Sequence, residues 1–74
     1  MKLMKADLLL HQDIYQEASV IQAIQDFRRL AHIKLKHQGD YFVCAFSRCV
    51  YEKETTIHEF SNYVIDLMNN VVLE

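Results

Sequence analysis

Histidine and cysteine are the residues of this sequence whose chemistry would be easiest to recognise. There are four histidines and two cysteines: His11, His32, His37, His58, Cys44 and Cys49. A zinc site needs three or four such ligands brought together in space. Alternation along one predicted strand puts His32 and His37 on opposite faces, and the other two histidines belong to other elements. The spacing therefore predicts no metal site, and no cofactor is expected.

Covalent catalysis would need a nucleophile held beside a base. Cys44 is expected to pack as a small apolar residue, and only Arg48 stands near Cys49 to activate its thiol. Ser47 and Ser61 lack the glycine-flanked turn of an activated serine. The carboxylates fall on predicted helix surfaces or in a loop: Asp26, Glu52, Glu54, Glu59 and Asp66. We therefore predict no catalytic residues and a protein that is not an enzyme.

The composition predicts one small folded domain over residues 1–74. A chain of this length buries too little surface to maintain two cores. Its hydrophobic fraction of 51% and charged fraction of 24% are typical of a globular protein. The net charge of −2 does not favour nucleic acid or an acidic membrane as a partner.

The cellular setting is predicted from the cysteines and from the apolar runs. Two cysteines are too few for a disulfide framework, which favours a reducing compartment. No run approaches the roughly 18 apolar residues of a membrane span. We expect a cytoplasmic protein that does not enter the membrane. The final Leu73-Glu74 pair is typical of residues that cloning adds before an affinity tag, and no inference rests on it.

Two segments have the periodicity of amphipathic helices. In residues 16–30, apolar side chains recur at three- and four-residue steps, and Arg28 and Arg29 would suit the negative end of the helix dipole. A second helix is predicted to begin at Thr56, because Thr56 and Glu59 match the capping box.

Three other segments are predicted to be strands: residues 6–11, 32–37 and 41–47. The second alternates apolar and charged residues, the third is apolar on both faces, and Gln38-Gly39-Asp40 supplies a turn between them. The order β-α-β-β-α is that of a split βαβ unit. We predict an α+β fold of the truncated ferredoxin-like type, with a three-stranded antiparallel sheet and two helices on one face.

The side-chain parity of the hairpin predicts which residues lie under the helices. A loop of two or four residues puts five apolar residues on one face: Ile33, Leu35, Phe42, Cys44 and Phe46. For this hairpin we expect Lys36 opposite Tyr41, Lys34 opposite Val43 and Ile33 opposite Cys44. A three-residue loop would bury a lysine, at a cost that the turn preference cannot offset.

The reverse face of the sheet is the predicted contact surface. Its candidate partner-binding residues are Leu9, Lys34, Lys36, Tyr41 and Val43, with Ala45 at the centre and Asp7, His11 and His32 at the fringe. No third helix is available to cover this face. It is either an ordinary solvated sheet face or a contact surface for a partner chain or a second copy. The first strand also leaves an edge that could accept an extended peptide.

A nucleic-acid interpretation rests on residues 39–43, which partly match the central-strand motif of RNA-recognition domains. Gly39, Phe42 and Val43 fit that motif, but Gln38 and Asp40 replace its basic and aromatic positions. Parity also places Phe42 in the core. We therefore expect no nucleic-acid partner.

The apolar pattern of the chain resembles the HxsD proteins of the bacterial His-Xaa-Ser system. The residues that carry the resemblance are Ile14-Tyr15, Ala18, Ala23, Phe27, Ala31, the hairpin of residues 33–46, residues 60–70 and above all Leu67-Met68-Asn69-Asn70. The sequence departs from the family signature after Asn70, where Val71 and Val72 replace a tyrosine-containing step. The resemblance implies a small accessory component encoded with radical S-adenosylmethionine proteins and a repeat protein.

Three functional hypotheses follow. The first is a non-enzymatic accessory or interaction module that binds a peptide or protein, in the setting that the resemblance implies. The second is a structural homodimer that packs through the open sheet face. The third, an enzyme, has no constellation of residues to support it.

Overall fold

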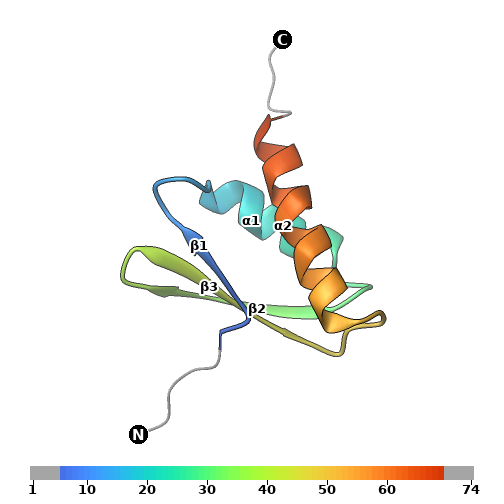
Figure 1. Ribbon diagram of the computed structural model, residues 1–74. Coiled ribbons are helices and arrows are strands. Elements are labelled where there is room, and N and C mark those ends of the chain that lie inside the picture. The colour runs from blue at the N-terminus through green and yellow to red at the C-terminus, as the bar shows by residue number, and fades with distance from the viewer. Residues whose placement is uncertain (1–5, 70–74) are drawn as a thin grey trace, which may run out of the picture.

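The computed structural model describes residues 6–69, and these form three strands and two helices in the predicted order. The elements are β1 (Leu8–His11), α1 (Glu17–Asp26), β2 (His32–Gln38), β3 (Tyr41–Ser47) and α2 (Lys53–Asn69). The antiparallel sheet has the strand order β1-β3-β2, and both helices pack on one side of it (Figure 1). This α+β arrangement is consistent with a truncated ferredoxin-like fold, as predicted. The Leu73-Glu74 pair, and Asn70 at the end of the family match, lie outside the described residues.

The β2–β3 hairpin closes through the two-residue turn Gly39-Asp40. Gly39 has φ of 61°, a left-handed conformation that glycine adopts without strain. The predicted parity is confirmed, but the predicted pairs are wrong by two residues, because Lys36 lies opposite Val43 and Gln38 opposite Tyr41. Compared with the predicted register, the two-residue turn lets His37 and Gln38 join the ladder and leaves the facing of every side chain unchanged.

Helix α1 ends four residues earlier than its apolar periodicity predicts. Phe27 leaves the helix with φ of −92° and ψ of 1°, and its carbonyl accepts hydrogen bonds from the amides of Leu30 and Ala31 in the following turn. The periodicity continues because Phe27 and Leu30 pack on the core from that turn. Arg28 and Arg29 therefore lie beyond the helix, and the prediction that they complement its dipole is wrong.

Helix α2 begins three residues before the predicted capping box. The Thr56 hydroxyl donates to the Glu52 carbonyl oxygen at 2.9 Å, and the Thr56 amide donates to the same oxygen at 3.0 Å. Thr56 is thus already one turn inside the helix, with its side chain buried. A hydroxyl that bonds back to the preceding turn is compatible with a helix interior, so the Thr-x-x-Glu pattern did not mark the start.

The core lies between the helices and one face of the sheet. Its buried members are Leu10, Val20, Ala23, Phe27, Ala31, Ile33, Phe42, Cys44, Phe46, Phe60 and Val64. Phe60 is central to it and packs edge-on against Phe27 and Phe46, with ring centroids 5.4 and 5.3 Å apart. Such edge-to-face contacts add to the burial of the rings themselves.

Truncation of a core side chain should show how much this single layer contributes to the free energy of unfolding. Val64 is fully buried and Val50 is 63% exposed in a loop. We expect Val64→Ala to lower the free energy of unfolding by about 1.5–2.5 kcal/mol, because it removes buried methyl groups and leaves a cavity. The matched control Val50→Ala should change it by less than about 0.5 kcal/mol. Equal losses in urea titrations of the two variants would contradict the described packing.

The two cysteines provide a chemical test of the same core. Burial raises the pKa of the Cys44 thiol to about 11, so almost none of it is thiolate at pH 8. Cys49 is only partly buried. We expect iodoacetamide at pH 8 to alkylate Cys49 alone in the native protein and both cysteines in guanidinium chloride, as measured by mass spectrometry. Equal alkylation of Cys44 in the native protein would mean that the sheet opens readily.

Candidate interaction surface

The face of the sheet away from the helices is built by alternation along three paired strands. Register places Val43 of the central strand between Leu9 and Lys36, and Tyr41 between His11 and Gln38. Ala45 pairs with Lys34 one step along. Within residues 6–69 no helix or further strand lies over this side (Figure 1). We call it the open face.

The candidate residues differ in how much of their surface a partner could contact. Leu9 is 54% exposed and Tyr41 is 41% exposed, and the side chains of Lys34 and Lys36 are also exposed. Val43 lies on the same face but is only 2% exposed, so the expectation that it offers apolar contact area is wrong. It is the central position of the face and is flanked by neighbours on both strands. The apolar area available to a partner therefore comes from Leu9 and Tyr41.

The outer edge of β1, with which no strand of residues 6–69 pairs, is the second feature of this surface. The backbone amide of Gln12 donates to the Asp40 carbonyl at 2.8 Å. Because backbone groups alternate in direction along an antiparallel strand, the N–H and C=O groups of Leu8 and Leu10 point toward β3, and those of Leu9 and His11 point away from it. The His11 carbonyl accepts from the amides of Ile14 and Tyr15. The N–H and C=O of Leu9 and the N–H of His11 remain on the outer edge, where a ferredoxin-like fold would place its fourth strand.

The two edges of the sheet differ in composition. Strand β2 carries Lys34 and Lys36, and charged side chains on an edge strand discourage pairing with other chains. Strand β1 is Leu-Leu-Leu-His and contains neither lysine nor proline. Of the two edges, β1 is therefore the one without the residues that discourage pairing.

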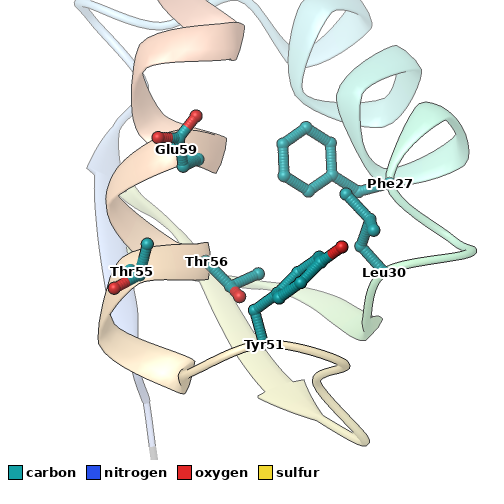
Figure 2. Close-up of a pocket in the computed structure, with 6 residues that line it drawn as sticks. All are labelled: Phe27, Leu30, Tyr51, Thr55, Thr56 and Glu59. Carbon is teal, nitrogen blue, oxygen red and sulfur yellow. The ribbon is translucent and has the colours of Figure 1, made fainter.

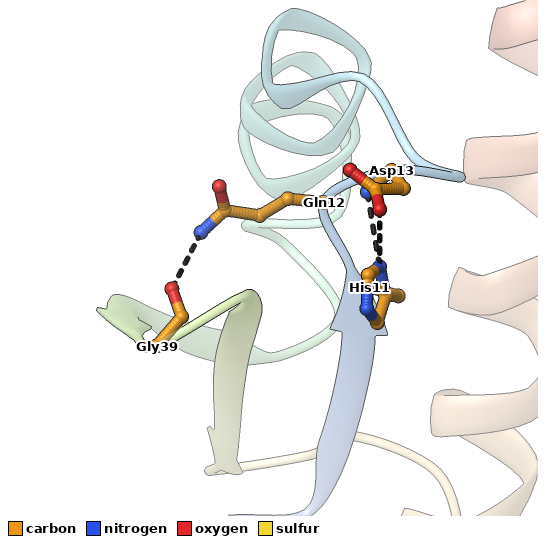
Figure 3. Close-up of polar contacts among 4 residues, drawn as sticks. All are labelled: His11, Gln12, Asp13 and Gly39. Atoms are coloured by element: carbon orange, nitrogen blue, oxygen red, sulfur yellow. Dashed lines mark hydrogen bonds and ion pairs between the residues drawn. The ribbon is translucent and has the colours of Figure 1, made fainter.

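The far end of the β1 edge is held by contacts to the hairpin turn. The Gln12 side-chain amide donates to the Gly39 carbonyl at 3.2 Å, and the Asp13 amide donates to His11 Nδ1 at 3.1 Å (Figure 3). The His11 ring also meets the Tyr41 ring edge-on, with centroids 4.9 Å apart. These contacts fix the orientation of His11 and Tyr41, the two aromatic rings at this end of the open face.

The near end of β1 is held by Asp7. Its Oδ2 accepts a 2.7 Å hydrogen bond from the Phe46 amide, and its Oδ1 lies 3.2 Å from Lys53 Nζ at the start of α2. One carboxylate therefore joins the first strand, the third strand and the second helix.

Two recesses in the described part of the chain could receive part of a ligand. The larger, of about 280 Å³, lies between the end of α1 and the start of α2 and is lined mostly by apolar atoms of Phe27, Leu30, Tyr51 and Thr56, with Thr55 and Glu59 at its rim (Figure 2). The smaller, of about 160 Å³, lies on the β2–β3 strands and is lined by His32, Lys34, Ala45, Phe46 and Ser47. Sequence reasoning missed both, because each joins elements whose relative placement depends on tertiary packing.

The residues with potential for chemistry remain apart in space. His37 Nε2 lies 2.9 Å from Glu17 Oε2, which links β2 to α1, and His11 lies 3.8 Å from Asp13. Across residues 6–69, no group of three or more histidine, cysteine, aspartate or glutamate side chains is placed to hold a metal ion. Tyr63 donates a 2.6 Å hydrogen bond to Asp26, which raises the pKa of the Tyr63 hydroxyl and joins the two helices.

Two further observations concern possible partners. Phe42, the aromatic residue that fits the RNA-recognition motif, is buried under the helices and is not available to stack on a base. Among the helices of residues 6–69, neither has the length and apolarity needed to cross a bilayer.

Comparison with models of protein families, with curated proteins and with solved structures found no match to this chain.

Removal of the Asp7 side chain should loosen the start of the β1 edge. Asp7→Ala leaves the Phe46 amide without its carboxylate acceptor, and we expect a loss of about 1–3 kcal/mol in the free energy of unfolding. Lys53→Ala removes only a partly exposed ion pair and should cost about 0–1 kcal/mol. Urea unfolding of both variants, with Asp7→Asn as a control that keeps an acceptor oxygen, measures the difference. A cost for Lys53→Ala as large as that for Asp7→Ala would show that the ion pair dominates.

Proposed function

We propose that this protein is a non-enzymatic interaction module that holds a protein or peptide partner on its open face and along the β1 edge. The observation that carries the proposal is a combination of two features of residues 6–69: a sheet face that no helix covers, and an adjoining edge, Leu8–His11, that contains neither lysine nor proline. A partner strand beside β1 would occupy the place of the fourth strand of a ferredoxin-like fold, a strand that residues 6–69 do not contain. It would run antiparallel to β1 and complete the ferredoxin-like sheet.

The edge by itself offers a modest gain. Pairing with Leu9 and His11 adds two or three hydrogen bonds, each worth about 0.5–1.5 kcal/mol net. Burial of the Leu9 side chain adds at most about 1.5–3 kcal/mol. Association costs on the order of 4–15 kcal/mol in lost freedom of motion. A partner must therefore contact Tyr41 and the lysines of the open face as well as the edge.

The resemblance to HxsD proteins supplies a setting for such a partner. It implies a small accessory component beside radical S-adenosylmethionine enzymes and a His-Xaa-Ser repeat protein. Presentation of a peptide to a modifying enzyme requires that an extended chain be held without being altered. A sheet edge can do this because it binds the peptide through its backbone and leaves alternate side chains free.

The alternative is a structural homodimer that packs through the same face. The exposed Leu9 and Tyr41 side chains favour it, since two copies would double the apolar area buried. Sedimentation distinguishes the two functions. A dimer through this face should dissociate in Tyr41→Glu, because two carboxylates would be brought into the interface, whereas a monomeric wild type would exclude the homodimer.

Strand addition at β1 can be tested with a substitution that blocks the edge and preserves the sheet. Proline is tolerated on an edge strand where its missing N–H would face solvent, and the Leu9 N–H faces outward. We expect a synthetic His-Xaa-Ser repeat peptide to shift the NMR signals of Leu9, His11 and Tyr41. Leu9→Pro should weaken binding of this peptide at least about tenfold, because the paired edge is lost.

The matched control is His37→Pro, which removes an outward N–H from the opposite edge of the sheet. It should bind the peptide like the wild type, with circular dichroism confirming that both variants fold. Shifts confined to the helices, or equal binding by Leu9→Pro and the wild type, would contradict the proposal.

A further inference from the structure

Charge is distributed unevenly between the two sides of the molecule. The chain has ten acidic and eight basic residues, for a net charge of −2. On the open face, however, Lys34 and Lys36 are both exposed, and neither forms an ion pair within residues 6–69. Two carboxylates of the described chain border this face: the oxygens of Asp7 are engaged by the Phe46 amide and by Lys53, and Asp13 lies 3.8 Å from His11. The open face is therefore locally basic in an acidic protein.

The smaller recess concentrates the donors of this face. Register pairs Lys34 with Ala45 and His32 with Ser47, so alternation sets the side chains of Lys34, His32 and Ser47 on the same side of neighbouring strands. The Ser47 hydroxyl has only a long contact of 3.5 Å to the His32 carbonyl, and no hydrogen bond of the described residues engages the His32 ring or the Lys34 ammonium. The side chains of Lys34, His32 and Ser47 thus border one recess, with the small side chain of Ala45 beside it.

The size of the recess limits what it can hold. Its volume of about 160 Å³ is well below the roughly 300–1,000 Å³ of pockets for whole ligands, and it suits a single functional group. The Lys34 ammonium and the His32 ring have no hydrogen-bond partner within residues 6–69, and a positive donor favours a negatively charged acceptor. A carboxylate meets both conditions, because it offers two oxygens and a full charge.

We propose that the recess formed by His32, Lys34 and Ser47 binds the carboxylate of an aspartate or glutamate side chain, so that the partner of this protein is an acidic segment. The inference rests on the proposed function and specifies the chemistry of its partner. The recess lies at the end of the sheet where β1 begins, since Leu8 pairs with Cys44 and Lys34 with Ala45. A chain that follows β1 can therefore cross the open face and reach it.

The same charge distribution disfavours a second copy of this chain as the partner on the open face. Each copy would present Lys34 and Lys36, and like charges on two facing surfaces oppose association. An acidic partner is attracted by the feature that repels a second copy. The two lysines also protect the β2 edge from pairing with other chains. Edge protection explains Lys34 and Lys36 equally, whereas only Lys34 lines the recess.

The first experiment uses acetate as a probe of the recess. Sodium acetate is titrated into ¹⁵N-labelled protein, with sodium chloride at matched ionic strength as the control. We expect saturable shifts of the Ala45, Phe46 and Ser47 amides with acetate alone. Lys34→Gln should abolish them, and Lys36→Gln, on the same strand and face but outside the recess, should keep them. Equal behaviour of the two variants would overturn the carboxylate site.

The second experiment separates the acidic preference from partner binding in general. Three hexapeptides alternate valine with glutamate, glutamine or lysine. We expect the glutamate peptide to bind about threefold to tenfold more tightly than the glutamine peptide at low salt, and the preference to shrink as salt screens the charges. Lys34→Gln should reduce this preference more than Lys36→Gln does.

The outcomes distinguish the two proposals. Glutamate and glutamine peptides that shift the β1 and Tyr41 signals with equal affinity would leave the interaction module standing and overturn the acidic partner. Acetate binding at the recess, with no peptide shifting the β1 signals, would support the carboxylate site and overturn the module.

Discussion

The hairpin of β2 and β3 is held in one orientation by the cost of burying a charged side chain. Lysine alternates with isoleucine and leucine along β2, so one face of that strand can lie under the helices and the other cannot. Once Ile33 and Leu35 face the core, pairing carries Phe42, Cys44 and Phe46 to the same side. The helices pack on that side, and the open face is what remains.

The lengths of the strands extend this argument to the edges. Strand β3 is central and apolar on both faces, and it is paired along most of its length on both sides. Strand β1 has only four residues, and the turns at its two ends are tied to the rest of the sheet by Asp7 and Gln12. A short strand that is anchored at both ends keeps its outer backbone groups in a fixed geometry, which is the condition for recognising an extended chain with little loss of entropy.

The proposed contact surface depends on an uneven distribution of charged residues between the helices and the open face. Most acidic residues of the described chain lie on the helices and loops, whereas the sheet face carries the two lysines and the donors of the recess. Electrostatic complementarity of this kind contributes more to the choice of partner and the rate of encounter than to affinity. Apolar contact at Leu9 and Tyr41 and backbone pairing along β1 would supply the affinity, so the two features are complementary.

The helix ends show where local patterns were insufficient. Apolar spacing predicted a first helix through residue 30, but Phe27 and Leu30 reach the core from a turn, and core contact does not require helical backbone. Thr56 and Glu59 matched a helix start, yet the hydroxyl of Thr56 bonds to Glu52 from within the helix. In both places several local structures satisfy the same pattern, and packing selects among them.

By itself, the sequence determined the order of the elements, the parity of the hairpin and the side of the sheet that the helices cover. These follow from periodicity and from the cost of burying lysine, which act over a few neighbouring residues. Tertiary structure decided the two-residue turn, the burial of Val43 and the meeting of His32 and Lys34 with Ser47. Those outcomes depend on which residues lie opposite one another across strands, and loops of two and four residues have the same parity, so the sequence pattern could not choose between them.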